Sequence, residues 1–406
     1  LAQQRLRKST STAGFNTPDT GVINNAGNPL VPQSMEGTLA SATFTAEDAV
    51  LFKRLHKESV GATVNEFTRI EQHGDEDIDP FFAEGGVPAA SPTKYTRDFS
   101  KITYMGVQGA VTFAMMHSRI VGPNASAEAE EVQRKTLHLI GRIEDALYFS
   151  DSDLNPFAFD GLAAILKKEA PGNIHDLRGQ VMTGKVMRQD MAKARDLFSK
   201  PNLIIMSHNA RGALGDLAEP TIRRTVTPGA KTQVGTTAEG LNADHGYIPF
   251  ESTTFLKAKG APGVASLAPD PNKAAPSQPS ITAEAAADDA TSLFASDDAG
   301  TYGYRIRAVG PNGVSAPKAS NLIAVGKKQK VSITVAAPTG TEVWYYRVYR
   351  TTLNGALGND NDATVGTERY AFSFPAAAQG ATVITDKNED IPGTTWSFAL
   401  QMTPDV

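Results

Sequence analysis

The spacing of apolar residues predicts several helices in the first half of the chain. The clearest covers residues 125–150, where Ser126 is expected to act as the N-cap and acidic residues follow in the first turn. Its apolar positions recur at helical spacing, at Val132, Leu139, Ile143, Ala146 and Leu147. At 1.5 Å per residue this helix is roughly 35 Å long, which is typical of a structural spine.

Shorter amphipathic segments surround this helix. Residues 45–60 place Ala49, Phe52 and Leu55 on one stripe, with Thr45 expected as the cap. A helix is also predicted over residues 183–199, followed by the apolar strand Asn-Leu-Ile-Ile-Met-Ser and a further helix over 208–217. Helices that alternate with strands indicate an α+β or α/β organisation.

A long β-hairpin is predicted over residues 62–113. Two strand-like arms flank a polar middle that is rich in Gly and Pro. Because this middle is too polar to form a core, it is expected to project and to find its contacts elsewhere. It nevertheless contains Phe81 and Phe82 beside Glu84, and the second arm carries Tyr95 and Phe99. Exposed aromatic residues of this kind usually mark an interface.

The spacing of apolar residues changes near Pro262. A linker rich in Pro, Ala and Ser leads into short strands with alternating apolar positions and turns such as Gly-Pro-Asn-Gly. Residues 302, 304, 306 and 308 are expected on one face of a strand, and residues 331, 333 and 335 on one face of another. This segment is interpreted as an inserted β-sandwich of about 110 residues. The closing strand Trp-Ser-Phe-Ala-Leu-Gln-Met returns to the first pattern.

Composition narrows the classes of function. The chain has 406 residues, with 39 basic and 44 acidic residues, a net charge of −5 and no cysteine. The absence of cysteine excludes disulfides and thiolate metal sites. An acidic chain is not expected to be a dedicated nucleic-acid binder. No stretch approaches 18 consecutive apolar residues, so no membrane span is predicted.

Motifs for catalysis and for metal or cofactor binding are incomplete. The run Gly179 to Lys185 resembles part of a phosphate loop, but Val186 stands where Ser or Thr must bind magnesium. Three acidic runs begin like calcium loops, at Asp75, Asp151 and Asp386, but each lacks the Gly and the Glu of an EF-hand. No histidine pair has metal-ligand spacing, and there is no nucleophile elbow. We therefore expect no catalytic residue, no metal and no cofactor.

Three segments, at residues 81–113, 146–166 and 384–406, stand in an order that is specific. Together they resemble the major capsid proteins of tailed bacteriophages with the Hong Kong 97-type fold. The segment FFAEGGVPAASPTKYTRDFSKITYMGVQGAVTF is similar to the descending arm of the family's E-loop. The segment ALYFSDSDLNPFAFDGLAAIL is similar to the passage from the spine helix into the A-domain. The segment ITDKNEDIPGTTWSFALQMTPDV resembles the exit from an immunoglobulin- or fibronectin-like insertion in large contractile-tailed, Twort-like phages.

The resemblance implies an α+β Hong Kong 97-like capsid fold with an inserted all-β immunoglobulin-like sandwich. The expected parts are an extended N-terminal arm (1–44), an N-terminal helix (45–61), the E-loop hairpin (62–118), the peripheral-domain spine helix (119–152), the axial A-domain (153–262), the inserted sandwich (263–393) and a return strand (394–406).

The function that this resemblance implies is structural. The chain is expected to assemble as hexamers and pentamers into an icosahedral shell around double-stranded DNA, in the virion, after assembly in the host cytoplasm. The expected partners are other copies of itself, other capsid, portal, scaffold or decoration proteins, and packaged DNA bound non-specifically, with no membrane. Phe81, Phe82, Glu84, Tyr95 and Phe99 are the expected inter-subunit contacts of the E-loop.

The basic start of the chain has two interpretations. Arg5, Arg7 and Lys8 lie in an eight-residue stretch without an acid. They are expected to contact either packaged DNA or acidic residues of a neighbouring subunit.

Two other classes of function remain as alternatives. One is a cell-surface or adhesion binding protein with an immunoglobulin-like module, which would carry a signal peptide and tandem sandwiches. The other is an α/β hydrolase-type enzyme with an accessory sandwich, which would show a concave site with perturbed titratable groups.

Overall fold

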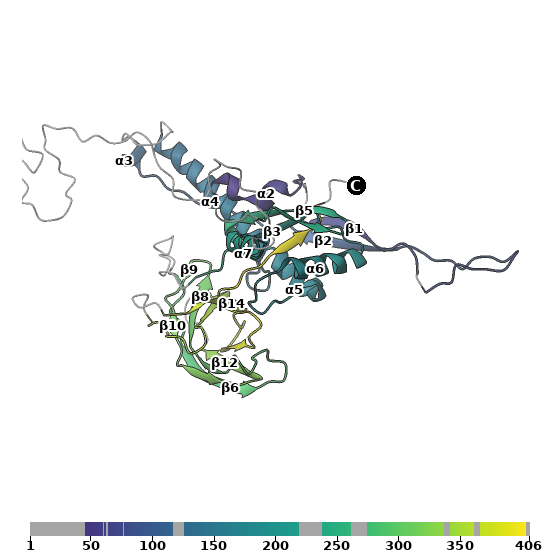
Figure 1. The fold of residues 1–406 in the computed structure, drawn as a ribbon. Helices are drawn as coiled ribbons and strands as arrows, with labels where there is room; N and C mark the ends of the chain where they lie inside the picture. Colours follow the sequence, from purple (N-terminus) through teal and green to yellow (C-terminus); the bar gives the residue numbers. More distant parts are fainter. Residues whose placement is uncertain are drawn as a thin grey trace, which may run out of the picture. The chain divides into compact units, whose positions relative to one another are not determined.

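The computed structural model describes residues 45–59, 61, 64–75, 77–116, 126–218, 238–260, 274–336, 342–360 and 366–402. It is a mixed α and β structure (Figure 1). The chain divides into two units, one with residues 1–45 and 106–139 and the other with residues 46–105 and 140–406. Arg5, Arg7 and Lys8 lie outside the described residues.

The hairpin consists of two antiparallel strands, β1 (Val64–Gln72) and β2 (Lys94–Lys101). The second arm is predicted to extend to Phe113, but strand β2 ends at Lys101. A short helix, α3 (Phe113–Met116), follows. The long helix α4 (Ala127–Phe149) agrees with the prediction for residues 125–150, and Ser126 caps it by accepting a hydrogen bond from the Ala129 N–H at 3.3 Å.

The predicted helix over residues 45–60 is wrong in its cap and its length. Residues 46–48 form a 3₁₀ turn, and the α-helix α2 spans only Val50–Arg54. Its N-cap Ala49 offers no side-chain acceptor. Instead, the buried carboxylate of Glu144, on α4, accepts hydrogen bonds from the N–H groups of Leu51 (3.0 Å) and Phe52 (2.8 Å). A long-range carboxylate thus satisfies the free N–H groups of α2.

A four-stranded sheet in the order β16-β3-β5-β4 forms the centre of the α/β part. Its strands are β3 (Leu203–Ser207), β4 (Gly240–Ala243), β5 (Gly246–Thr253) and β16 (Phe398–Leu400). The helices of this part are α5 (Leu162–Glu169), α6 (Gly184–Asp196) and α7 (His208–Ala218), with 3₁₀ turns at Pro171–Asn173 and Thr254–Leu256.

All five residues of β3 are buried, because both faces of this strand are covered. Ile204 and Met206 join one apolar cluster with Met187 and Met191 of α6. Leu203 and Ile205 join a second cluster with Tyr148 of α4, Leu51 of α2 and Phe398 of β16. The strand therefore divides the core of this part into two layers.

From β6 to β15, the described residues form strands and no helix (green to yellow in Figure 1). One sheet has the order β15-β12-β6 and another the order β10-β8-β13-β14, with β9 beside β8 and a β11-β7 pair. The strands are Ile281–Asp288 (β6), Gly300–Tyr302 (β7), Tyr304–Gly310 (β8), Gly313–Val314 (β9), Lys318–Ala319 (β10), Ile323–Val325 (β11), Gln329–Val335 (β12), Tyr345–Arg350 (β13), Arg369–Pro375 (β14) and Thr382–Asp386 (β15).

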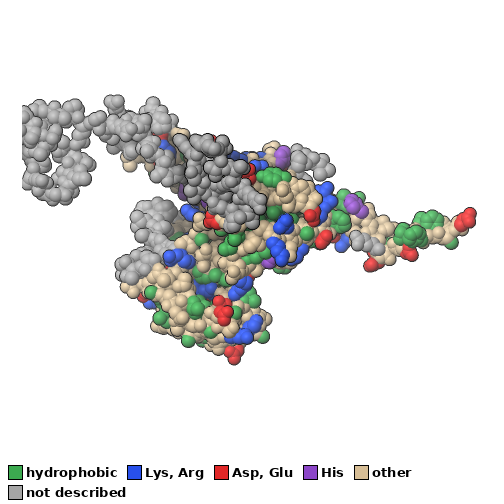
Figure 2. Space-filling view, viewed as in Figure 1, with side chains coloured by type: hydrophobic (Ala, Val, Ile, Leu, Met, Phe, Trp, Pro, Cys, Tyr) green, Lys and Arg blue, Asp and Glu red, His purple; other side chains and the backbone are tan. Residues whose placement is uncertain are grey.

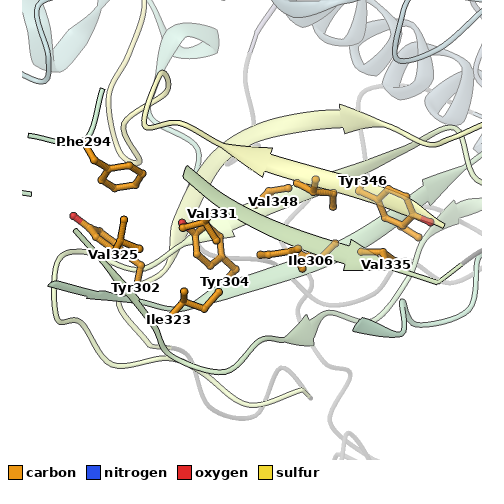
Figure 3. Close-up of a cluster of buried hydrophobic side chains, with 13 residues drawn as sticks. Phe294, Tyr302, Tyr304, Ile306, Ile323, Val325, Val331, Val335, Tyr346 and Val348 are labelled. Atoms are coloured by element: carbon orange, nitrogen blue, oxygen red, sulfur yellow. The ribbon is translucent and has the colours of Figure 1, made fainter. Parts of the chain in front are cut away.

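Side chains from these sheets form one apolar core (Figure 3). The predicted faces are confirmed, since Tyr302, Tyr304, Ile306 and Ala308 lie in this core with Val331, Ile333 and Val335. Strand β8 departs from simple alternation, because all seven of its residues are buried. Its opposite face holds Arg305 and Arg307, whose charged groups have buried partners. We call residues 276–390 the β region.

Candidate interaction surface

The register of the hairpin places four apolar side chains on one face. Ile70 lies opposite Tyr95, and Val64 and Phe99 belong to the same face because alternate residues point the same way. Their exposed fractions are 41% for Val64, 51% for Ile70, 64% for Tyr95 and 76% for Phe99. Glu66 and Arg97 lie on the same face between them. We call the four apolar residues the apolar face. Sequence reasoning found Tyr95 and Phe99 but missed Val64 and Ile70, which only the strand pairing identifies.

Three ion pairs link the two strands. Arg97 of β2 lies 3.2 Å from Glu66 of β1, and Arg69 lies 3.3 Å from Asp98. Lys94 lies 3.0 Å from Glu71, and hydrogen bonds from Thr96 and then Lys94 lower the pKa of the Glu71 carboxyl. Because these groups are solvent-exposed, each pair contributes little to the stability of the chain. The two strands are therefore joined by hydrogen bonds and exposed ion pairs, and they bury little apolar surface between them.

The segment that connects the strands, residues 73–93, carries the other predicted contacts. We call it the tip. It is closed by hydrogen bonds from the Asp75 N–H to the Ser91 hydroxyl (2.6 Å) and from the Thr93 hydroxyl to the His73 carbonyl (3.0 Å). A turn from Ala83 to Gly86 follows, with Gly85 at φ 83°. Glycine fits this left-handed conformation without the strain of a Cβ.

The aromatic residues of the tip are strongly exposed. Phe81 is 87% exposed and Phe82 is 59% exposed, and Glu84 beside them is also exposed. Figure 2 shows hydrophobic and acidic side chains together along this segment. The five predicted contact residues thus fall into two groups: Phe81, Phe82 and Glu84 lie on the tip, whereas Tyr95 and Phe99 lie on the apolar face.

Two of the acidic runs that imitate calcium loops are neutralised by basic side chains of the protein. The ammonium group of Lys168 lies 2.8 Å from Asp151 and 3.0 Å from both Asp153 and Asp160. Burial lowers the pKa of Lys168, but the hydrogen bonds to these carboxylates outweigh it and raise the pKa above its ordinary value. The amine thus occupies the centre of this acidic cluster.

The run at Asp386 is also occupied by cationic side chains. Arg350 donates to the Asp386 carboxylate and to the Asn388 side chain, each at 2.7 Å. Arg178, from the loop before α6, donates to the Asn388 carbonyl at 2.6 Å and to the Leu293 carbonyl at 3.1 Å. Arg178 therefore ties the α/β part to the β region through backbone carbonyls.

Among the described residues, the carboxylates of the third run, in the tip, have only local hydrogen-bond partners. Asp75 and Asp79 each accept a hydrogen bond from a backbone N–H two residues later, at 3.1 and 3.0 Å. Across the residues that the structure describes, no group of three or more His, Cys, Asp or Glu side chains is placed to hold a metal ion. Among the described helices, none has both the length and the apolar character required to cross a membrane.

The glycine- and lysine-containing run at residues 179–185 serves as a helix start. Thr183 is the N-cap of α6 and its hydroxyl accepts a hydrogen bond from the Val186 N–H at 3.4 Å. Gly179 has φ 74°, as a turn before a helix allows.

The chain is similar over its whole length to the major capsid proteins of Staphylococcus phages S25-3, S25-4 and K. Each is 22% identical to it, and each alignment covers all of this chain and 85% of the relative. No family model matches the chain. These relatives confirm the resemblance to phage major capsid proteins that the three sequence motifs indicate.

Proposed function

We propose that this protein is the structural subunit of an icosahedral phage shell that encloses double-stranded DNA, and that it assembles as hexamers and pentamers. One observation carries the proposal: a chain related over its full length to major capsid proteins exposes the aromatic residues of a two-stranded hairpin. A hairpin that buries little of its own surface needs a neighbouring molecule to cover it. Symmetry would multiply such contacts over many subunits.

We propose the Hong Kong 97-type fold for the α/β part. In this assignment the β1–β2 hairpin is the E-loop, α4 is the spine helix, and the sheet with α5, α6 and α7 is the axial domain. The β region would be the immunoglobulin-like insertion. The pairing of β3 with both β5 and β16 supports an insertion, because the chain leaves the sheet after one neighbour of β3 and returns as the other.

The protein would act by assembly and not by catalysis. Its partners would be other copies of itself and other capsid, portal, scaffold or decoration proteins, within the virion and, before that, in the host cytoplasm. The apolar face would lie across the spine helix of the adjacent subunit. Expansion of the shell would then proceed by rotation of rigid parts, with bending at the ends of the hairpin and of α4.

The double variant Phe81→Asp/Phe82→Asp tests the assembly role. We expect it to leave the circular dichroism spectrum unchanged, because both rings are exposed, and to prevent the formation of particles in sedimentation and electron microscopy. The matched control, Leu322→Asp/Val383→Asp, changes two residues of the β region that are 56% and 50% exposed. Particles in normal yield from the hairpin variant would contradict the proposal.

Arg5, Arg7 and Lys8 would contribute either a salt-screened contact to DNA phosphates or an ion pair to a neighbour. Replacing all three by Ser separates the two roles. A change in the salt sensitivity of filled particles alone would support DNA contact. An equal weakening of empty particles would show that the arm binds protein.

A further inference from the structure

The tip combines strong negative charge with exposed aromatic rings. Residues 73–93 contain five acidic residues and no Lys or Arg. Within the described part of this segment, Asp75, Asp77, Asp79 and Glu84 form no ion pair, and Phe81 is 87% exposed. A partner surface for the tip should therefore be basic and should offer an apolar contact.

The C-terminal end of α6 has these properties. Leu197 and Phe198 follow the helix and are 66% and 87% exposed. The basic residues Lys193, Arg195 and Lys200 are exposed around them, with one exposed acid, Asp196, so this end of the helix keeps a net positive charge. In the described residues none of these three forms a salt bridge.

The backbone at Phe198 gives a second reason to assign this end a binding role. Phe198 has φ 62°, and its N–H donates to the Arg195 carbonyl at 3.0 Å as the helix closes. Glycine is the usual residue in this left-handed position, and a bulky side chain is rare there. An 87% exposed phenyl ring gains little from burial within its own chain. The backbone of Phe198 is therefore strained, and its ring is exposed where another molecule can contact it.

The spine helix offers the acidic tip no comparable surface. Arg134 and Lys135 of α4 pair with Glu130 and Glu131 one turn earlier, at 2.7 and 3.4 Å, and Arg142 pairs with Asp145 at 3.8 Å. The positive charges of α4 are thus largely compensated within the helix. The strands are also about 27 Å long, so the tip and the apolar face can contact different parts of a neighbour.

We propose that the tip of one copy docks on the C-terminal end of α6 in a second copy, with Phe81 and Phe82 against Leu197 and Phe198. The acidic residues of the tip then face Lys193, Arg195 and Lys200. Both partner surfaces are exposed in one chain, so the contact forms between chains. This inference rests on the proposed assembly function and names the surface that receives the tip.

Because the chain contains no cysteine, disulfide trapping can test the contact directly. The variant Phe82→Cys/Phe198→Cys is assembled and oxidised with diamide, then analysed on non-reducing gels. We expect disulfide-linked multimers from particles and none from unassembled chains. The control Phe82→Cys/Val383→Cys places the second thiol on the β region, where Val383 is 50% exposed. Crosslinking of assembled particles no greater than in this control would overturn the proposal.

Charge reversal gives an independent test if the cysteine variant does not assemble. Lys193→Glu/Arg195→Glu should lower the yield of particles about tenfold, because like charges then face each other. Adding Asp77→Lys/Asp79→Lys should restore the yield. Failure of restoration, with wild-type particles forming normally, would overturn this docking site but not the assembly function. Failure of the wild type to form particles would instead contradict the assembly function.

Discussion

The hairpin and the β region use the same kinds of residue in opposite ways. In the β region, Tyr304, Ile306 and Tyr346 are at most 1% exposed and share one core. In the hairpin, Ile70, Tyr95 and Phe99 are more than half exposed. Both regions consist of antiparallel strands that carry aromatic and branched apolar residues, so these residues alone do not reveal whether they have a partner within the chain.

Their ion pairs differ in the same way. Arg305 and Glu368 in the β region lie 2.7 Å apart with side chains that are fully buried. Arg97 and Glu66 in the hairpin lie 3.2 Å apart with side chains that are 74% and 58% exposed. If one partner of a buried pair is removed, the other charge is left without compensation. In an exposed pair, water can solvate the remaining charge. This difference indicates that contacts within the chain stabilise the β region, whereas the side chains of the hairpin are exposed and can contact a neighbouring molecule.

The largest expected effect comes from breaking the buried pair. Arg305→Met should destabilise the β region by about 3–5 kcal/mol, because it leaves the Glu368 carboxylate buried without its charged partner. Urea unfolding of the unassembled full chain, followed by near-ultraviolet circular dichroism, measures this loss. The matched change Arg97→Met in the hairpin should cost less than about 1 kcal/mol. Equal losses in the two variants would remove the distinction between the regions.

One isoleucine substitution in each region tests whether its apolar residues are buried within the chain. Ile333→Ala should cost about 2–5 kcal/mol, since Ile333 is 1% exposed in the core of the β region. Ile70→Ala should change the free energy of unfolding by no more than about 0.5 kcal/mol, because Ile70 is half-exposed. The same urea titration reports both values. A large loss of monomer stability from Ile70→Ala would show that the apolar face is covered within its own chain.

The dependence of stability on pH should come partly from Glu368. Burial alone raises its pKa, but hydrogen bonds from Arg305 and from backbone N–H groups outweigh burial and lower the pKa below the ordinary value of 4.5. A lowered folded-state pKa contributes stability above pH 4.5 that is lost as the pH falls through the folded-state value. We expect Glu368→Gln to reduce the difference in melting temperature between pH 6 and pH 3. An unchanged difference would assign the acid sensitivity to other carboxylates.

A small effect is expected at Phe198, where stability and assembly should change in opposite directions. Phe198→Gly should stabilise the unassembled chain by about 1 kcal/mol, because glycine relieves the left-handed strain at φ 62°. The same change should weaken assembly, since it removes the proposed apolar contact. Thermal unfolding and particle yield measure the two effects separately. A destabilised monomer would show that the Phe198 ring packs within its own chain.

Local sequence patterns determined much of the secondary structure. Helix α4 at Ala127–Phe149, strand β3 and the core-facing residues of β8 and β12 all follow from periodicity, because each signal lies within one continuous segment. The exposed aromatics of the hairpin were also recognisable, since a polar, Gly-rich surrounding cannot bury them. The apolar and turn patterns of the sequence therefore determined which elements form and which aromatics lack a local core.

Only the tertiary structure decided features that join distant residues. Glu144 caps α2 from 93 residues away, Lys168 occupies the acidic cluster at Asp151, and the pairing of β1 with β2 adds Val64 and Ile70 to the apolar face. The charged face of β8 can be buried because Arg305 forms a hydrogen-bonded ion pair with Glu368, sixty-three residues later in the chain. The environment of a charged or apolar side chain depends on which distant residues the fold brings next to it. No local pattern of residues can specify that partner.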